Sequence, residues 1–177
     1  MKFSIEKAAL GKAVAQAQSV VERRNTIPIL ANVLIRKTGN AIQLTTSDLE
    51  IQIRTTAELG GDTGDFTTTV GARKLIDILK TMPADQTVSL ESSQSKLILK
   101  GGKSRFTLQT LPESDFPGLA AGDMTHSFSL PASDFKRLID RTQFAISTEE
   151  TRFYLNGIYM HAAGSAKAAT LRGVATD

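Results

Sequence analysis

The sequence contains no cysteine and no tryptophan, and only 6% of its 177 residues are aromatic. Without cysteine there can be no disulfide, thiolate nucleophile, iron–sulfur cluster or thiolate-bound zinc. No run of about 18 apolar residues occurs, so no membrane span is predicted, and no apolar segment with a small-residue cleavage site marks a secretory signal. We therefore expect a protein of the reducing cytoplasm.

Positive charge is in small excess, with 21 Lys and Arg against 18 Asp and Glu, for a net charge of +3. Such an excess permits binding to nucleic acid but does not require it, so the location of the cations matters more than their total. The scarcity of aromatic residues argues against an extended platform for stacking single-stranded bases, and Phe153-Tyr154 is the one pair that stands out.

No catalytic or metal-binding constellation is evident. His126 and His161 lie outside any HxxxH or HExxH pattern, and Gly102-Lys103-Ser104 lacks the first glycine and the following helix of a phosphate-binding loop. The acidic residues near turns, such as Asp48, do not form the convergent cluster that two-metal chemistry needs. We expect no enzyme activity and no cofactor; nuclease or nucleotidyl-transfer activity is the enzymatic alternative.

Short alternating segments separated by a few helical ones predict an α+β fold. A short strand leads directly into a helix three times, which indicates a repeated unit of one helix and several antiparallel strands. Ordinary α+β alternation is the simpler alternative. The strands expected before these helices are 3–5, 67–70 and 128–130, and the helices are 6–21, 72–80 and 133–141. Further strands are expected at 27–35, 42–46, 51–55, 88–90, 97–99, 106–108, 153–160 and 169–174.

The segment 111–122 is rich in Pro, Gly, Asp and Ala and is the best candidate for a linker. We therefore expect one complete domain over residues 1–122 and a second that begins at 123. The last repeat would leave strand edges and apolar faces uncovered, so we expect residues 123–177 to be the first half of a truncated domain.

Two of the expected helices are amphipathic, with a net basic polar side. A solvent-exposed polar side explains either helix alone. Because the basic side occurs in both helices, it favours a surface that binds phosphates without recognising the base sequence. The polar sides carry Arg73, Lys74, Asp77 and Lys80 in one helix and Lys136, Arg137 and Arg141 in the other. Arg23-Arg24 adds a basic loop ahead of the segment 27–35.

Eight short strings follow one another along the chain. They are Thr26–Leu30, Thr46–Glu50, Ala72–Lys74, Ser104–Phe106, Leu111-Pro112, Asp115–Pro117, Phe153–Gly157 and Val174–Asp177. In this order they closely resemble the bacterial sliding clamp family, the β subunit of DNA polymerase III, over the whole chain.

The resemblance implies a DNA-clamp fold, with helices toward a central DNA hole and sheets outside. Family members are ring-shaped homodimers of a three-domain chain that slide on duplex DNA of any sequence and tether the replicative polymerase. The implied partners are duplex DNA, the DNA polymerase III α subunit and the clamp loader. With the third domain absent, we expect this sequence not to close a ring. An interaction module that binds peptides without DNA is the alternative.

The resemblance also assigns site residues. The DNA-binding residues it implies are Arg24, Arg73, Lys80, Phe153 and Tyr154. The implied dimer-interface residues are Lys74, Lys103, Arg105 and Phe106, and the implied peptide groove includes Leu155 and Thr176. Relatives can have a neutral polar residue at the position of Glu149, so the resemblance does not imply that Glu149 contacts DNA.

Overall fold

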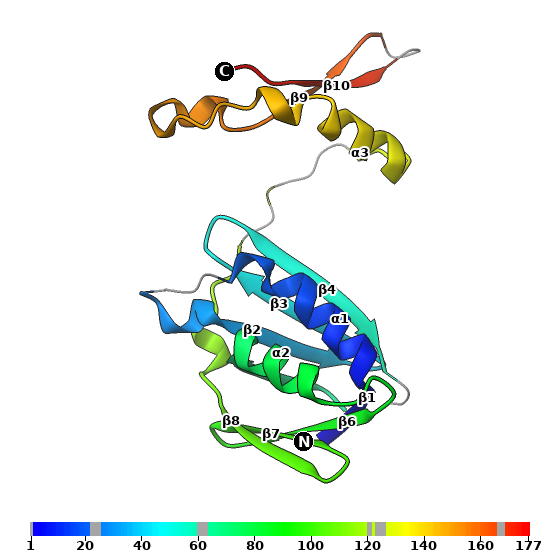
Figure 1. The fold of residues 1–177 in the computed structure, drawn as a ribbon, viewed down its shortest axis with the longest axis vertical. Coiled ribbons are helices and arrows are strands. Elements are labelled where there is room, and N and C mark those ends of the chain that lie inside the picture. Colours follow the sequence, from blue (N-terminus) through cyan, green and yellow to red (C-terminus); the bar gives the residue numbers. More distant parts are fainter. Residues whose placement is uncertain (1, 22–25, 60–63, 120–121, 123–126, 166–168) are drawn as a thin grey trace. The chain divides into compact units, whose positions relative to one another are not determined.

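The computed structural model describes the whole chain except residues 1, 22–25, 60–63, 120–121, 123–126 and 166–168. The chain divides into two compact units, Met1–Ala120 and Ala121–Asp177 (Figure 1). Within the described residues, no helix is long and apolar enough to cross a membrane.

The first unit uses one motif twice: a strand, a helix and three antiparallel strands. The first copy comprises β1 (Lys2–Glu6), α1 (Lys7–Ala17), β2 (Asn32–Thr38), β3 (Ala41–Ser47) and β4 (Gln52–Glu58). The second copy comprises β5 (Phe66–Gly71), α2 (Ala72–Thr81), β6 (Thr87–Ser93), β7 (Lys96–Gly101) and β8 (Ser104–Gln109). The predicted repeat of helix and antiparallel strands is confirmed for these two copies.

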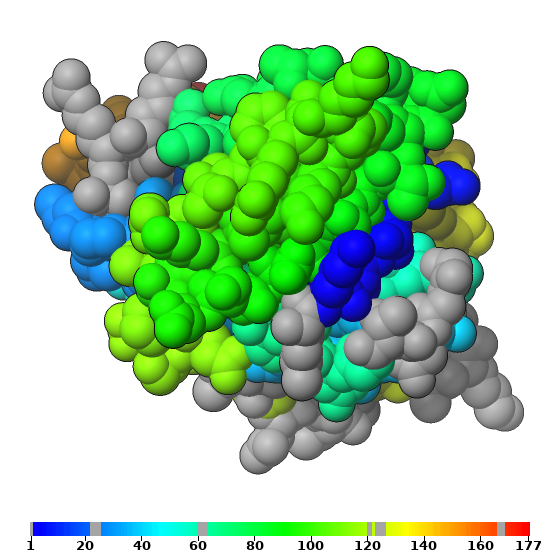
Figure 2. All heavy atoms as spheres, turned by 90° about the horizontal axis from the view of Figure 1, so that it is seen from below, coloured from blue at the N-terminus to red at the C-terminus, as the bar shows by residue number. Residues whose placement is uncertain are grey.

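The first strand of each copy belongs to the sheet of the other copy. The two four-stranded sheets have the orders β1-β6-β7-β8 and β4-β3-β2-β5, and β1 and β5 pair antiparallel to β6 and β2. Figure 2 looks onto this end of the unit and shows β1, in blue, against the green segment from β6 to β8. Because each sheet takes a strand from both copies, neither copy completes its sheet alone.

Both helices contribute to a single core that the two sheets share. Leu10 and Val14 of α1, and Leu75 and Leu79 of α2, are spaced four residues apart and are at most 1% exposed. The apolar side predicted for the helix 72–80 is confirmed, since Ala72, Leu75, Ile76 and Leu79 are buried and Arg73, Lys74 and Lys80 are exposed.

The hairpin turn predicted at 100–103 is confirmed. Gly101 pairs with Ser104, and Gly102 has φ +55°, a backbone angle that favours glycine. At the end of β8, Thr69 of β5 fixes the outgoing chain: its Oγ1 donates to Leu111 O (2.7 Å) and accepts from Leu111 N (3.1 Å).

The strand predicted over 27–35 begins later than expected. Pro28–Ala31 form a 3-10 helix, with Leu30 N donating to Ile27 O, and β2 starts only at Asn32. Proline has no N–H for a sheet ladder, and its fixed φ suits the first turn of a helix.

The second unit contains α3 (Ala132–Asp140), a 3-10 segment at Glu150–Leu155, and a hairpin of β9 (Tyr159–Ala163) and β10 (Thr170–Val174). Leu138 of α3 packs against the hairpin at Gly173, where a Cβ would lie 3.3 Å from Leu138 Cγ. The predicted helix 133–141 and the last predicted strand are confirmed.

Two predicted strands of this unit are wrong. Residues 127–130 are not a strand, and Phe128 is 70% exposed, since no strand of the described chain pairs with this segment. The strand predicted at 153–160 begins only at Tyr159, because Phe153 and Tyr154 belong to a 3-10 segment closed by a bond from Asn156 N to Phe153 O (3.1 Å). The turn-forming pair Asn156-Gly157 opposes an extended conformation there.

Candidate nucleic-acid interface

Helices α1 and α2 lie side by side in the first unit (Figure 1), and a basic hollow runs between them. The hollow has a volume of about 230 Å³ and is lined by Lys7, Ala8, Gly11, Lys12 and Ala15 of α1 and by Ile76, Leu79 and Lys80 of α2. Three ammonium groups therefore share one surface, which we call the basic helical face: Lys7, Lys12 and Lys80.

The local sequence explains why this face is both open and positive. Ala8, Gly11 and Ala15 recur on one side of α1, and a Cβ at Gly11 would meet no atom within 4 Å. There is no acidic residue in α1, and none of the three lysines forms an ion pair with any residue that the structure describes. Their charge is therefore available to an external anion.

Arg73, one of the implied DNA contacts, is exposed in the first turn of α2. Its Nη2 donates to Val21 O at 3.3 Å, which uses one of the five N–H donors of the guanidinium. Among the described residues the other donors have no hydrogen-bond partner, so they can meet phosphate. Arg24, the other arginine of the implied set, lies outside the described residues.

Sequence reasoning missed Lys7 and Lys12. The alanines of α1 weaken the contrast between its two sides, so the helix does not stand out as amphipathic. The signal that could have found these lysines is the absence of any acidic residue from 7 to 21.

A second hollow separates α2 from the strand β8. It has a volume of about 480 Å³ and is lined by Arg73, Lys74, Asp77, Ile78, Thr81 and Phe106. The structure thus brings Lys74 and Phe106 together. In the described chain β8 pairs only with β7, so its other edge is an exposed strand edge, and Lys103 and Arg105 are exposed beside it.

The third helix is less basic in effect than its composition implies. Arg137 pairs with Asp134 (3.0 Å) and Lys136 pairs with Asp140, one helical turn apart in each case. Among the described residues of α3 and its C-cap, Arg141 is the cation without an ion pair. The basic helical face of the first unit therefore has no equal on α3.

In the second unit, Phe153 and Tyr154 are 76% and 71% exposed, and their rings meet edge to face with centroids 5.8 Å apart. Tyr154 also borders an apolar hollow of about 250 Å³, lined by Tyr154, Leu155, Gly157, Ile158, Tyr159, Val174, Ala175 and Thr176. Leu155 and Thr176, which the resemblance assigns to one peptide groove, line the same hollow.

The described residues hold no group of three His, Cys, Asp or Glu side chains that could bind a metal ion. The first unit offers fixed positive charge and an exposed strand edge, and the second unit offers an exposed aromatic pair and an apolar hollow. These features suit binding to a polyanion and to other chains.

Comparison with known proteins defines the class. Solved structures with the same fold include the DNA polymerase III subunit beta from Pseudomonas aeruginosa (TM-score 0.91, 41% identity) and the DNA polymerase sliding clamp from Caulobacter crescentus (TM-score 0.92, 41% identity). Each comparison covers 100% of this chain, and 47% and 48% of the two solved chains. The fold is that of the sliding clamps.

Family models give the same class and identify the individual domains. Residues 1–120 match the N-terminal domain of the DNA polymerase III beta subunit, and residues 129–177 match its central domain. The beta sliding clamps of Pseudomonas aeruginosa and Caulobacter vibrioides are 43% and 42% identical over the whole chain. The chain belongs to the DNA polymerase III beta subunit family, and it spans about half the length of these curated relatives.

Proposed function

We propose that the chain acts as part of a sliding clamp, a noncatalytic processivity factor that encircles duplex DNA as a ring-shaped dimer and tethers the replicative polymerase. The observation that carries this proposal is the basic helical face, where Lys7, Lys12 and Lys80, none of them ion-paired to a described residue, line a hollow beside an acid-free helix α1. Ammonium groups on such a surface neutralise phosphates of any sequence, as sliding requires.

Residues of both units contribute to the proposed DNA contacts. Lys80 and Arg73, together with Lys7 and Lys12, would face duplex phosphates, and Arg24 would extend this set. Phe153 and Tyr154 would contact single strand, since exposed rings stack on bases regardless of sequence. In domain terms, residues 1–122 would form the first clamp domain, and residues from 123 onward would belong to the second.

The exposed edge of β8 is the proposed subunit interface. An unpaired strand edge can extend a sheet into another chain, and Phe106 offers an apolar contact beside the hollow that Lys74 also lines. Lys103 and Arg105 would supply the polar border of that interface.

The apolar hollow at Leu155 and Thr176 is the proposed docking groove for peptides of the DNA polymerase III α subunit and the clamp loader. Its lining is mostly apolar, with the Tyr154 and Tyr159 side chains at its border. A groove of this kind takes short hydrophobic peptide segments.

The test measures duplex DNA binding against salt concentration for the chain and for Lys12→Ala, Lys80→Ala and the double variant. Because each lost phosphate contact reduces the slope of log K against log salt by about 0.9, the double variant should lose nearly twice that. Affinity should fall equally for unrelated duplex sequences.

Lys96→Ala is the matched control, since Lys96 is exposed on β7 and its removal changes the net charge by the same amount. Equal losses for Lys96→Ala and Lys12→Ala would refute the proposed face. If duplex binding is absent while hydrophobic peptides still bind at the hollow of Leu155 and Thr176, the chain is an interaction module instead.

A further inference from the structure

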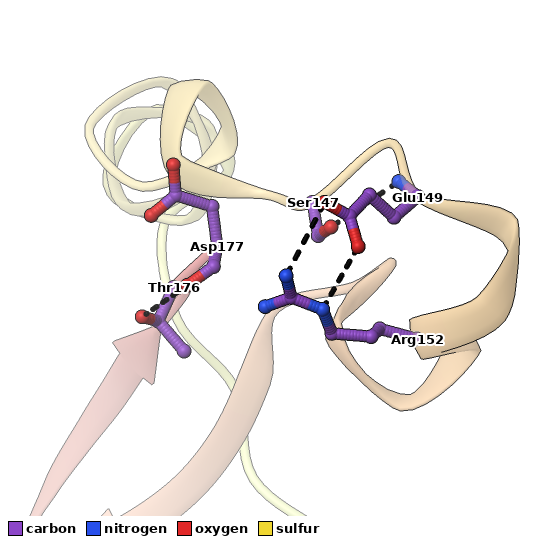
Figure 3. Close-up of polar contacts among 5 residues, drawn as sticks. All are labelled: Ser147, Glu149, Arg152, Thr176 and Asp177. Atoms are coloured by element: carbon purple, nitrogen blue, oxygen red, sulfur yellow. Dashed lines mark hydrogen bonds and ion pairs between the residues drawn. The ribbon is translucent and has the colours of Figure 1, made fainter.

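The segment from Ser147 to Asn156 closes on itself around one ion pair (Figure 3). Ser147 is the one described residue of the second unit that is buried, at 6% exposure. Its N–H donates to Leu155 O (3.1 Å) and its Oγ accepts from Glu149 N (3.2 Å). With its amide nitrogen facing inward, Asn156 donates to Ser147 O (2.9 Å) and Glu149 O (3.3 Å).

Inside this closed segment, the Arg152 guanidinium turns back onto the Glu149 carboxylate. Arg152 Nε lies 2.8 Å from Glu149 Oε2, and Nη2 lies 3.2 Å from Oε1. The carboxylate therefore makes a bidentate contact with the guanidinium. A phosphate binds the same edge of a guanidinium with the same bidentate geometry. Figure 3 shows both contacts.

The ion pair lies next to the aromatic pair in sequence, and neither partner is buried. The Arg152 and Glu149 side chains are 47% and 56% exposed, so the pair contributes little to stability and a competing anion can displace the carboxylate. Phe153 and Tyr154, which follow Arg152 directly, are the exposed rings on which bases would stack.

We propose that Arg152 is a phosphate-binding residue for single-stranded DNA, and that Glu149 restrains it by occupying its guanidinium. Bases stacked on Phe153 and Tyr154 bring their own phosphates next to Arg152, where they must compete with the Glu149 carboxylate. Glu149 thus acts through Arg152, as a positioning residue that keeps single-strand binding weak. The inference rests on the single-strand contact of the proposed function and adds a restraint on it.

The experiment measures binding of a fluorescently labelled dT oligonucleotide, by anisotropy over a range of salt concentrations, to the 177-residue chain and its variants. Glu149→Gln should raise the affinity roughly fivefold, the equivalent of an exposed ion pair that no longer competes. It should also steepen the slope of log K against log salt by about 0.7, the value for one added phosphate contact on a single strand. A purely structural role for Glu149 would leave that slope unchanged.

Four variants isolate the cause. Glu150→Gln makes the same change of charge at a neighbouring exposed residue that has no ion pair among the described residues, and should give less than half the gain. Arg152→Ala alone should change affinity less than twofold, and the double variant Glu149→Gln/Arg152→Ala should lose both the gain and the added slope. Glu149→Gln/Arg152→Lys keeps the positive charge but not the bidentate guanidinium. It should therefore keep the steeper slope of log K against log salt and lose part of the gain in affinity.

Equal gains for Glu149→Gln and Glu150→Gln would overturn the inference, because general electrostatics would then explain both. Weaker binding or an unchanged slope in Glu149→Gln would overturn it as well. The duplex measurement with Lys12 and Lys80 variants is separate: if duplex binding fails while the single-strand results hold, the clamp proposal is wrong and the restraint on Arg152 stands.

Discussion

Asp48 closes the hairpin loop between β3 and β4 through its carboxylate. Oδ1 accepts from Ile51 N (2.6 Å) and Glu50 N (2.9 Å), and between them Leu49 adopts φ +83°, which is costly for a residue with a Cβ. The Ile51 N–H bond is the main cause that lowers the pKa of Asp48 below its ordinary value. The need for an acceptor at this position is local, since the bonds to Glu50 N and Ile51 N offset the strain at Leu49.

Asp48→Asn should therefore lower the stability of the chain near neutral pH, and by less as the pH falls. The folded-state pKa of Asp48 is depressed, so its contribution is present above the unfolded value of about 3.9 and is lost as the pH falls through the folded-state pKa. Urea midpoints of both proteins from pH 7 to pH 3 give the measurement. A difference between them that stays constant down to the lowest pH would contradict this account, because asparagine keeps the acceptor and removes only the charge.

At the scale of elements, α3 depends on Gly173 for its contact with the β9–β10 hairpin. A Cβ at Gly173 would lie 3.2 Å from Ile158 Cγ2 and 3.3 Å from Leu138 Cγ, so these side chains would have to shift to make room for it. Gly157, in the same unit, has no atom within 4 Å of its own Cβ position.

Gly173→Ala should destabilise the hairpin by about 1–3 kcal/mol through overpacking, whereas Gly157→Ala should have little effect. Amide hydrogen exchange of β9 and β10 measures the change directly, since these strands report on the contact with α3. If the two alanine variants accelerate exchange to the same extent, the close contact at Gly173 does not limit the packing of α3.

Elements also show how far the sequence could predict this molecule. The helix 72–80 and the turn at Gly102 follow from local chemistry, which is why side-chain spacing and glycine were sufficient to predict them. Residues 128–130 alternate like a strand, but a strand exists only where another strand pairs with it. The exchange of β1 and β5 between sheets is likewise a long-range pairing that no local pattern contains.

The same distinction between local patterns and long-range contacts applies to the candidate site. The cations of α2 could be found because its apolar side is strong, and Lys7 and Lys12 were missed because α1 is mostly alanine. The Glu149–Arg152 ion pair has ordinary i, i+3 spacing, but its orientation depends on Ser147 and Asn156, which close the segment. Sequence patterns identified residue types, and backbone closure determined which groups meet.

At the scale of the whole molecule, hydrophobic burial is concentrated in the first unit. All buried hydrophobic residues that the structure describes lie between Phe3 and Leu108, and the second unit has only the buried Ser147. Because apolar burial is the main favourable term in folding, strands of the first unit should exchange their amides far more slowly than β9 and β10.

Within the first unit, the exchanged strands predict a single cooperative transition for both sheets. Leu75→Ala removes a fully buried side chain of α2 and should cost about 2–5 kcal/mol. Although α2 belongs to the second copy, β1 and β5 each cross to the other copy's sheet, so the loss should appear equally in both sheets. Hydrogen exchange measured strand by strand should show β3 and β7 losing the same protection free energy.

Leu111→Ala, at a partly exposed position, is the control and should cost far less. If β7 loses protection while β3 keeps it, the two sheets unfold separately, and strand exchange does not couple them into one structure.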